Sequence, residues 1–136
     1  MAKMNNKGRN LKKVSFAGIP RIVMDNPDYQ SLNGNAKALL LELAYQYKGN
    51  NNGDLTVAFS ILSKRGWKRG ATISVAIKKL LSAKLVVKTR ESQFSNPNSK
   101  CALYALTWQP INECLGKGLE VKPTITPPRK FSLEGK

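Results

Sequence analysis

The sequence contains no histidine, only two cysteines and only eight acidic residues among its 136 positions. Cys101 and Cys114 alone cannot complete a structural zinc site when no histidine is present. No paired carboxylates and no Ser or Cys beside a candidate base stand out as catalytic groups. We therefore expect a non-enzymatic protein with no metal and no cofactor, whose two thiols stay reduced and inert.

Long apolar runs are also missing from the chain. None approaches the roughly 18 residues that a membrane span requires. The basic N-terminus is followed by Arg21, Asp25 and Asp28 instead of the apolar segment of a secretory signal. No long stretch sets bulky apolar residues opposite a Lys/Arg face, as a helix lying on a membrane surface would. These absences favour a cytoplasmic protein that does not associate with membranes.

Positive charge is what the chain has in excess. Lys and Arg number 23, which gives a net charge of +15 and a pI near 10.1. Such an excess favours a polyanionic partner, with nucleic acid the first candidate. The length and the 41% of hydrophobic residues suit one globular domain with a modest core and a tail.

The stretch from Lys68 to Lys84 has the pattern of an amphipathic helix. Placed on a helical wheel, one arc is apolar and suits the core, with Ile73, Ala76, Ile77, Leu80 and Leu81. The opposite arc is small and basic, with Lys68, Ala71, Thr72, Val75, Lys78, Lys79 and Ser82. No carboxylate occurs between Leu55 and Arg90. This face suits close approach to a phosphate backbone, although lysines that merely solvate a helix would give the same pattern.

The neighbouring segments predict the architecture. A short helical pattern at 57–65 precedes this helix through Gly66 and Trp67. Two β-prone runs, 85–90 and 101–108, follow it and are separated by the polar loop 91–100, which we call the wing. Helix, turn, helix, strand, loop, strand is the order of a winged helix-turn-helix, an α+β fold with three helices and a small antiparallel sheet.

Candidate DNA-binding residues follow from this arrangement. Cations at the turn between the two helices oppose the macrodipole of the second helix, and either a DNA phosphate or solvent would compensate them. Wing residues would reach the DNA backbone or a minor groove. The full candidate set is Lys64, Arg65, Lys68, Arg69, Thr72, Val75, Lys78, Lys79, Arg90, Gln93, Asn96, Asn98 and Lys100.

Two aromatic residues have open roles. Trp67 is expected either as a core plug between the two helices or as a DNA-facing side chain. Phe94, within the polar wing, would tuck back onto the strands or lie against sugar or a partner protein.

The remaining segments frame the domain, which we place at 14–109. Residues 1–13 carry five cations and no acid and predict a flexible basic arm, either solubilising or phosphate-following. Residues 14–32 contain Pro20 and Pro27 and predict an extended segment packed through Phe16, Ile19, Val23 and Tyr29. A core helix is expected from Asn33 to Lys48, then a turn at 49–53 and a short strand at 54–56. The Pro-rich tail, 110–136, is expected either to wrap along the domain or to be disordered.

Several segments resemble helix-turn-helix proteins of bacterial phages, plasmids and integrative elements, and more loosely the N-terminal winged-helix domains of plasmid replication initiators. The resemblance covers about residues 16–122, and its most specific part is the segment LYALTW at 103–108. It is also carried by the segments 51–55, 65–67 and 103–111, and by Ile19-Pro20, Tyr29, Leu32, Ala36, Leu39 and Leu40.

The resemblance implies a winged-helix fold and binding to double-stranded DNA. It places the recognition helix on 69–83 and the wing on 91–100. It departs at Lys84, where the family often has Gly; if that position needs a positive φ, Lys costs up to about 1 kcal/mol. The implied role is a transcriptional regulator or an accessory factor for replication, excision or transfer.

Other partners stay open at this point. The chain is alternatively an RNA- or ribosome-associated basic protein, or a module whose tail docks a host or element-encoded protein. The sequence leaves open whether the protein is a homodimer.

Overall fold

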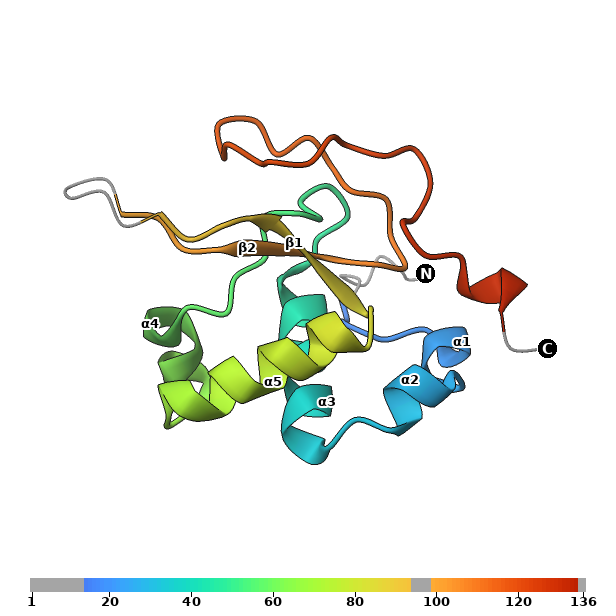
Figure 1. The fold of residues 1–136 in the computed structure, drawn as a ribbon, viewed down its shortest axis with the longest axis horizontal. Coiled ribbons are helices and arrows are strands. Elements are labelled where there is room, and N and C mark those ends of the chain that lie inside the picture. Colours follow the sequence, from blue (N-terminus) through green and yellow to red (C-terminus); the bar gives the residue numbers. More distant parts are fainter. Residues whose placement is uncertain (1–13, 94–98, 135–136) are drawn as a thin grey trace, which may run out of the picture.

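The computed structural model describes residues 14–93 and 99–134. The predicted basic arm at 1–13, and the predicted roles of Phe94, Asn96 and Asn98, lie outside these residues. Within them the chain is α+β, as expected, with helices grouped against one side of a small sheet (Figure 1). The elements are α1 (Arg21–Met24), α2 (Pro27–Gln30), α3 (Gly34–Gln46), α4 (Phe59–Leu62), η1 (Ser63–Arg65), α5 (Gly70–Ser82), β1 (Val86–Arg90), β2 (Leu103–Leu106) and η2 (Phe131–Leu133).

Helix α3 is the centre of the core. It starts at the predicted position, because the Asn33 side chain accepts a hydrogen bond from the Ala36 amide at 3.0 Å. Its apolar stripe is buried, and Leu39, Leu40 and Leu43 are fully enclosed. Helix α5 packs across α3, so one core holds both helices.

The segment 14–32 corrects the expectation of an extended chain, since it forms the short helices α1 and α2. Proline breaks a helix when it lies in the interior of that helix. Pro20 lies at the N-cap of α1, and Pro27 is the first residue of α2, where no amide donor is needed. Val23 is buried, and Ile19 and Tyr29 pack on the core as predicted. The predicted packing of Phe16 is wrong, because its side chain is 93% exposed.

Strands β1 and β2 form the predicted antiparallel pair, which is shorter than the two sequence patterns. Val86 pairs with Leu106, and Arg90 pairs with Leu103 beyond an irregularity after Lys88. Leu55 adds an isolated bridge to Tyr104 where a short strand was expected. The sheet covers one side of the helices with Val86, Tyr104 and Leu106.

The turn at 49–53 contains a buried residue that the sequence did not single out. Asn52 is fully buried, and its side chain bonds four backbone groups of the β2 end and the following segment. Its Oδ1 accepts from the Leu106 amide at 2.7 Å, and its Nδ2 donates to the carbonyls of Leu106, Gln109 and Pro110. The turn therefore ties α3 to the sheet and to the start of the tail.

The tail wraps the domain over residues 110–134, which is one of the two expected alternatives. It runs along the outer side of the sheet and returns to α1 and α2 (Figure 1). Phe131 is buried in the core, and Arg129 forms ion pairs with Asp28 and Glu134 at 2.7 and 2.8 Å. This packing makes residues 110–134 part of the domain, which the sequence pattern predicted to end at residue 109.

Candidate nucleic-acid interface

The candidate interface begins with the corner between α4 and α5. A single α-helical turn, α4, continues through η1 to Gly66, whose φ of 100° is left-handed and suits glycine. The predicted helix at 57–65 therefore exists, but it is shorter and buries only Leu62. Ile61 is 45% exposed, because a single turn presents only one side to the core.

Trp67 fills this corner, as the first of its two predicted roles required. It is partly buried against the core, and its Nε1 donates to Glu42 of α3 at 3.4 Å. Glu42 also pairs with Arg65, whose guanidinium lies 3.8 Å from the centre of the Tyr45 ring. The hydrogen bond that Arg65 donates to Glu42 is the main cause that raises the pKa of Arg65. Arg65 is thus committed to the corner, although part of its side chain stays exposed.

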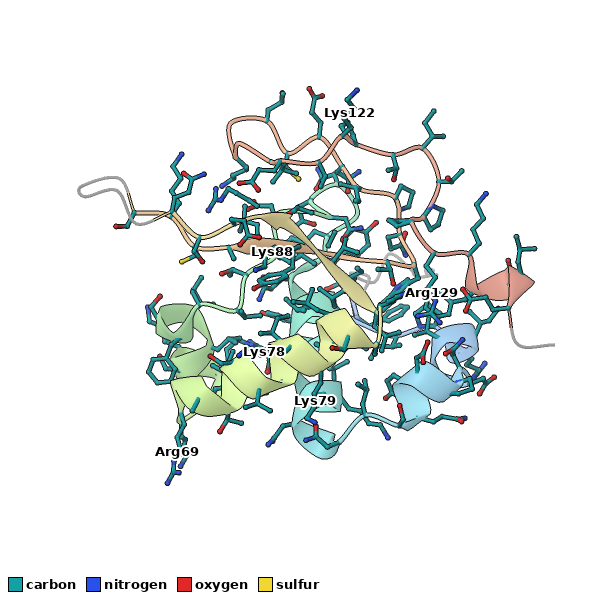
Figure 2. All side chains as sticks on the ribbon, in the orientation of Figure 1. Arg69, Lys78, Lys79, Lys88, Lys122 and Arg129 are labelled. Carbon is teal, nitrogen blue, oxygen red and sulfur yellow. The ribbon has the colours of Figure 1, made fainter. Side chains whose placement is uncertain are left out.

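The outer face of α5 is small and cationic. Its inner face buries Ile73, Ala76, Ile77 and Leu80. Its outer face exposes Val75, Lys78, Lys79 and Ser82, with Thr72 half-buried. Figure 2 shows Lys78 and Lys79 along the helix and Arg69 projecting from its beginning, away from the domain. The wheel predicted this division correctly, except that Leu81 is only partly buried.

The residue that follows the C-cap of α5 is Lys84, the position at which the sequences that this chain resembles often have Gly. Lys84 adopts a φ of 60°, the left-handed region that favours glycine. Arg129 of the tail donates to the carbonyls of Ala83 and Lys84 at 3.0 and 3.2 Å. A guanidinium there complements the negative end of the helix dipole and satisfies terminal carbonyls.

Arg90 does not belong to the interface, which corrects its place among the candidates. Its side chain lies under the tail and the residue is only 8% exposed. The guanidinium donates to the Lys117 carbonyl at 2.7 Å and, through Nε, to the Cys101 carbonyl at 3.1 Å. These bonds fasten the sheet to the tail, so the donors of Arg90 are not free for a phosphate.

Two of the four candidate DNA-binding residues of the wing, Gln93 and Lys100, lie within the described residues. Gln93 and Lys100 are exposed and face each other across the hairpin. Their backbones exchange two hydrogen bonds at 2.7 and 2.8 Å, so the ladder extends beyond β1 and β2. Asn96 and Asn98 lie outside the described residues.

Carboxylates near α5 are already neutralised. Glu42 pairs with Arg65, and Asp28 pairs with Arg129. Elsewhere Asp54 pairs with Lys117, and Glu91 with Lys88. Within residues 14–93 and 99–134, no ion pair involves the candidate cations Lys64, Lys68, Arg69, Lys78, Lys79 and Lys100. Positive potential around α5 is therefore uncompensated by the described chain.

No group of three or more Asp, Glu or Cys side chains is placed to hold a metal ion in the described part of the chain. Cys101 and Cys114 are both unpaired, and burial raises the pKa of the Cys114 thiol. None of the helices in the described ranges combines the length and the apolar character of a membrane span.

Comparisons of the chain with protein-family models, with curated proteins and with solved structures found no match.

Proposed function

We propose that this chain is a non-enzymatic double-stranded DNA-binding protein with a winged helix-turn-helix architecture. In this proposal α4 and α5 form the helix-turn-helix, α5 enters the major groove, and the β1–β2 hairpin with segment 91–100 is the wing. The element order and the antiparallel pairing of β1 with β2 support it. The main support for the proposal is the outer face of α5, which carries positive charge, otherwise has small side chains and has no carboxylates.

Duplex DNA fits this face better than single-stranded RNA does. Recognition of unpaired bases relies on stacking against aromatic or guanidinium planes. Helix α5 has no aromatic residue, and its only charged side chains are Lys78 and Lys79. Lysines bind phosphates as point charges, which suits the backbones that flank a groove.

The biological setting rests on the sequence resemblance. We propose a protein of a bacterial mobile element, acting in the cytoplasm as a transcriptional regulator or as an accessory factor for replication, excision or transfer. The DNA target decides among these processes. Sequencing DNA fragments that co-purify with the protein from cells identifies that target.

The first prediction tests the proposed contact with phosphates. Replacing Lys78 and Lys79 by Ala should weaken binding to all duplexes about equally, because phosphate contacts carry no sequence information. Each lost phosphate contact should lower the slope of log affinity against log salt by roughly 0.9. Titrations of a labelled mixed-sequence duplex at several salt concentrations measure both quantities.

The control is a matched pair of lysines on the tail. Replacing Lys122 and Lys130 by Ala removes the same charge from exposed positions outside α5 (Figure 2 labels Lys122). Binding should then change little beyond the small effect of net charge. An unchanged slope in the Lys78/Lys79 variant would mean that these lysines only solvate α5.

A further inference from the structure

Two open hollows lie along one edge of α5. The first has a volume of about 650 Å³ and lies between the second half of α5 and the residues that lead into α3. The second, about 470 Å³, lies between the start of α5 and the first turns of α3. On α5 the hollows are lined by Thr72, Val75, Lys78, Lys79 and Ser82, and Lys68 and Arg69 extend the second hollow. They therefore follow the outer face of the helix along much of its length.

The opposite wall of the first hollow comes from the segment that leads into α3, and that of the second comes from α3 itself. Ser31 and Asn33 line the first hollow, and Asn35 lines the second. These side chains are short, neutral and exposed. The Ser31 hydroxyl already donates to the Asp28 carbonyl at 3.2 Å. Side-chain amides such as those of Asn33 and Asn35, by contrast, are common donors to phosphate oxygens.

Each hollow contains one carboxylate, and an arginine neutralises each of them. In the first hollow Asp28 accepts from Arg129 at 2.7 Å. In the second hollow Glu42 pairs with Arg65. The lysines of the first hollow, and Lys68 and Arg69 of the second, are consequently left as net positive charge. Charge complementarity therefore favours a polyanion as the ligand, one that is long enough to span both hollows.

We infer that one phosphate backbone of the bound duplex follows this α3-side edge of α5, crossing both hollows past the first turn of α3. Strands β1 and β2, which lead into the wing, lie on the other, sheet side of α5 (Figure 1), where the second DNA strand would pass. This inference rests on the proposed function and adds to it. It makes Ser31, Asn33 and Asn35 part of the interface, although neither the helix pattern nor the wing pattern of the sequence pointed to them.

The test introduces a negative charge at Asn35. This residue is exposed, and its side chain forms no hydrogen bond within the described part of the chain. In Asn35→Asp the new carboxylate should repel the backbone and weaken duplex binding by roughly 3- to 10-fold at low salt. An acidic residue in the first turn of a helix is favourable for stability, so the thermal midpoint should stay equal or rise slightly. Lower affinity would then come without loss of fold.

Asn50→Asp is the matched control. The chemical change is the same, and Asn50 is exposed in the turn beyond the opposite end of α3. Its affinity for a labelled mixed-sequence duplex should stay within about twofold of wild type, the effect of net charge alone.

Three results would overturn the inference in distinguishable ways. Equal binding by Asn35→Asp, Asn50→Asp and wild type would remove this edge from the interface and leave the proposed function intact. Failure of the wild-type protein to bind any duplex would reject the proposed function and the inference together. Preferential binding of single-stranded RNA, weakened by Asn35→Asp, would keep the edge and reject duplex DNA as its occupant.

Discussion

At the scale of single residues, Asn52 offers the sharpest prediction of stability. Asn52→Ala would leave the Leu106 amide and three carbonyls without their present partner in the core. Losing a buried network of this size should lower the free energy of unfolding by about 2–4 kcal/mol. Denaturant unfolding followed by circular dichroism measures the change.

The neighbouring Asn50 provides the control for this prediction. It lies in the same turn but is exposed, so Asn50→Ala should change the free energy of unfolding by at most about 0.5 kcal/mol. Equal effects at the two positions would contradict the role given to the buried amide.

Residue-level prediction succeeded where a local pattern determines the environment. The 3.6-residue period on α5 separated Ile73 and Ile77 from Lys78 and Lys79 correctly. Residue-level prediction failed at Arg90 and Asn52, whose side chains donate hydrogen bonds to carbonyls 11 to 58 positions away in the chain. Composition favours an exposed Arg and a solvated Asn, and only the folded topology brings those carbonyls to them.

At the scale of elements, the wing can be tested by removing it. Replacing 91–100 by Asn-Gly would connect Arg90 to Leu103 through a four-residue loop that includes Cys101 and Ala102. The fold should persist, since Val86 and Leu106 keep their places in the core. Affinity for duplex DNA in a gel-shift titration should fall, because the proposed backbone contacts on the sheet side of α5 would be lost.

A milder variant distinguishes two causes of weaker DNA binding, the loss of a contact and a disturbance of the hairpin. Lys100→Ala keeps the loop and removes one exposed cation, so it should lower the salt slope by at most roughly 0.9. Full binding by both variants would exclude the wing as a contact.

The elements themselves were predictable to different degrees. Helices α3 and α5 have long periodic patterns, and the capping residue Asn33 marks the start of α3. The sequence pattern does not predict the short helices α1 and α2, because proline breaks a helix from its interior, whereas Pro20 and Pro27 lie at helix starts. In a four-residue helix there is no second turn to display a period, so capping is the only local signal.

At the scale of the whole molecule, the tail determines how the parts are joined. Arg129 connects α2, the end of α5 and η2 through Asp28, Ala83 and Glu134, and its guanidinium lies 4.3 Å from the centre of the Phe131 ring. This arrangement lowers the pKa of Glu134, chiefly through the hydrogen bond from Arg129. The sequence of the tail has no period from which to predict such packing, because its anchors are isolated residues in a Pro-rich segment.

The last prediction concerns specificity, which is a property of the whole interface. Reading bases in the major groove relies chiefly on Arg or Lys to guanine and on Asn or Gln to adenine. The outer face of α5 has no Arg, Asn or Gln, and Thr72 and Val75 can offer only weak contacts to thymine methyl groups. Arg69 lies at the N-cap of α5, is exposed and projects beyond the helix, so it is the best-placed base reader (Figure 2).

We therefore expect modest intrinsic specificity, with Arg69 reading one guanine and DNA shape or oligomerisation supplying the remainder. Selection from a pool of randomised duplexes should give a short motif with wild-type protein. Arg69→Ala should lose preference at one position, by about 1–3 kcal/mol of discrimination, whereas Lys68→Ala should weaken binding without changing the motif. A long, sharply defined motif for the monomer that survives Arg69→Ala would contradict this account, because Lys78 and Lys79 are assigned to phosphates and the remaining outer side chains of α5 are too small to distinguish four base pairs.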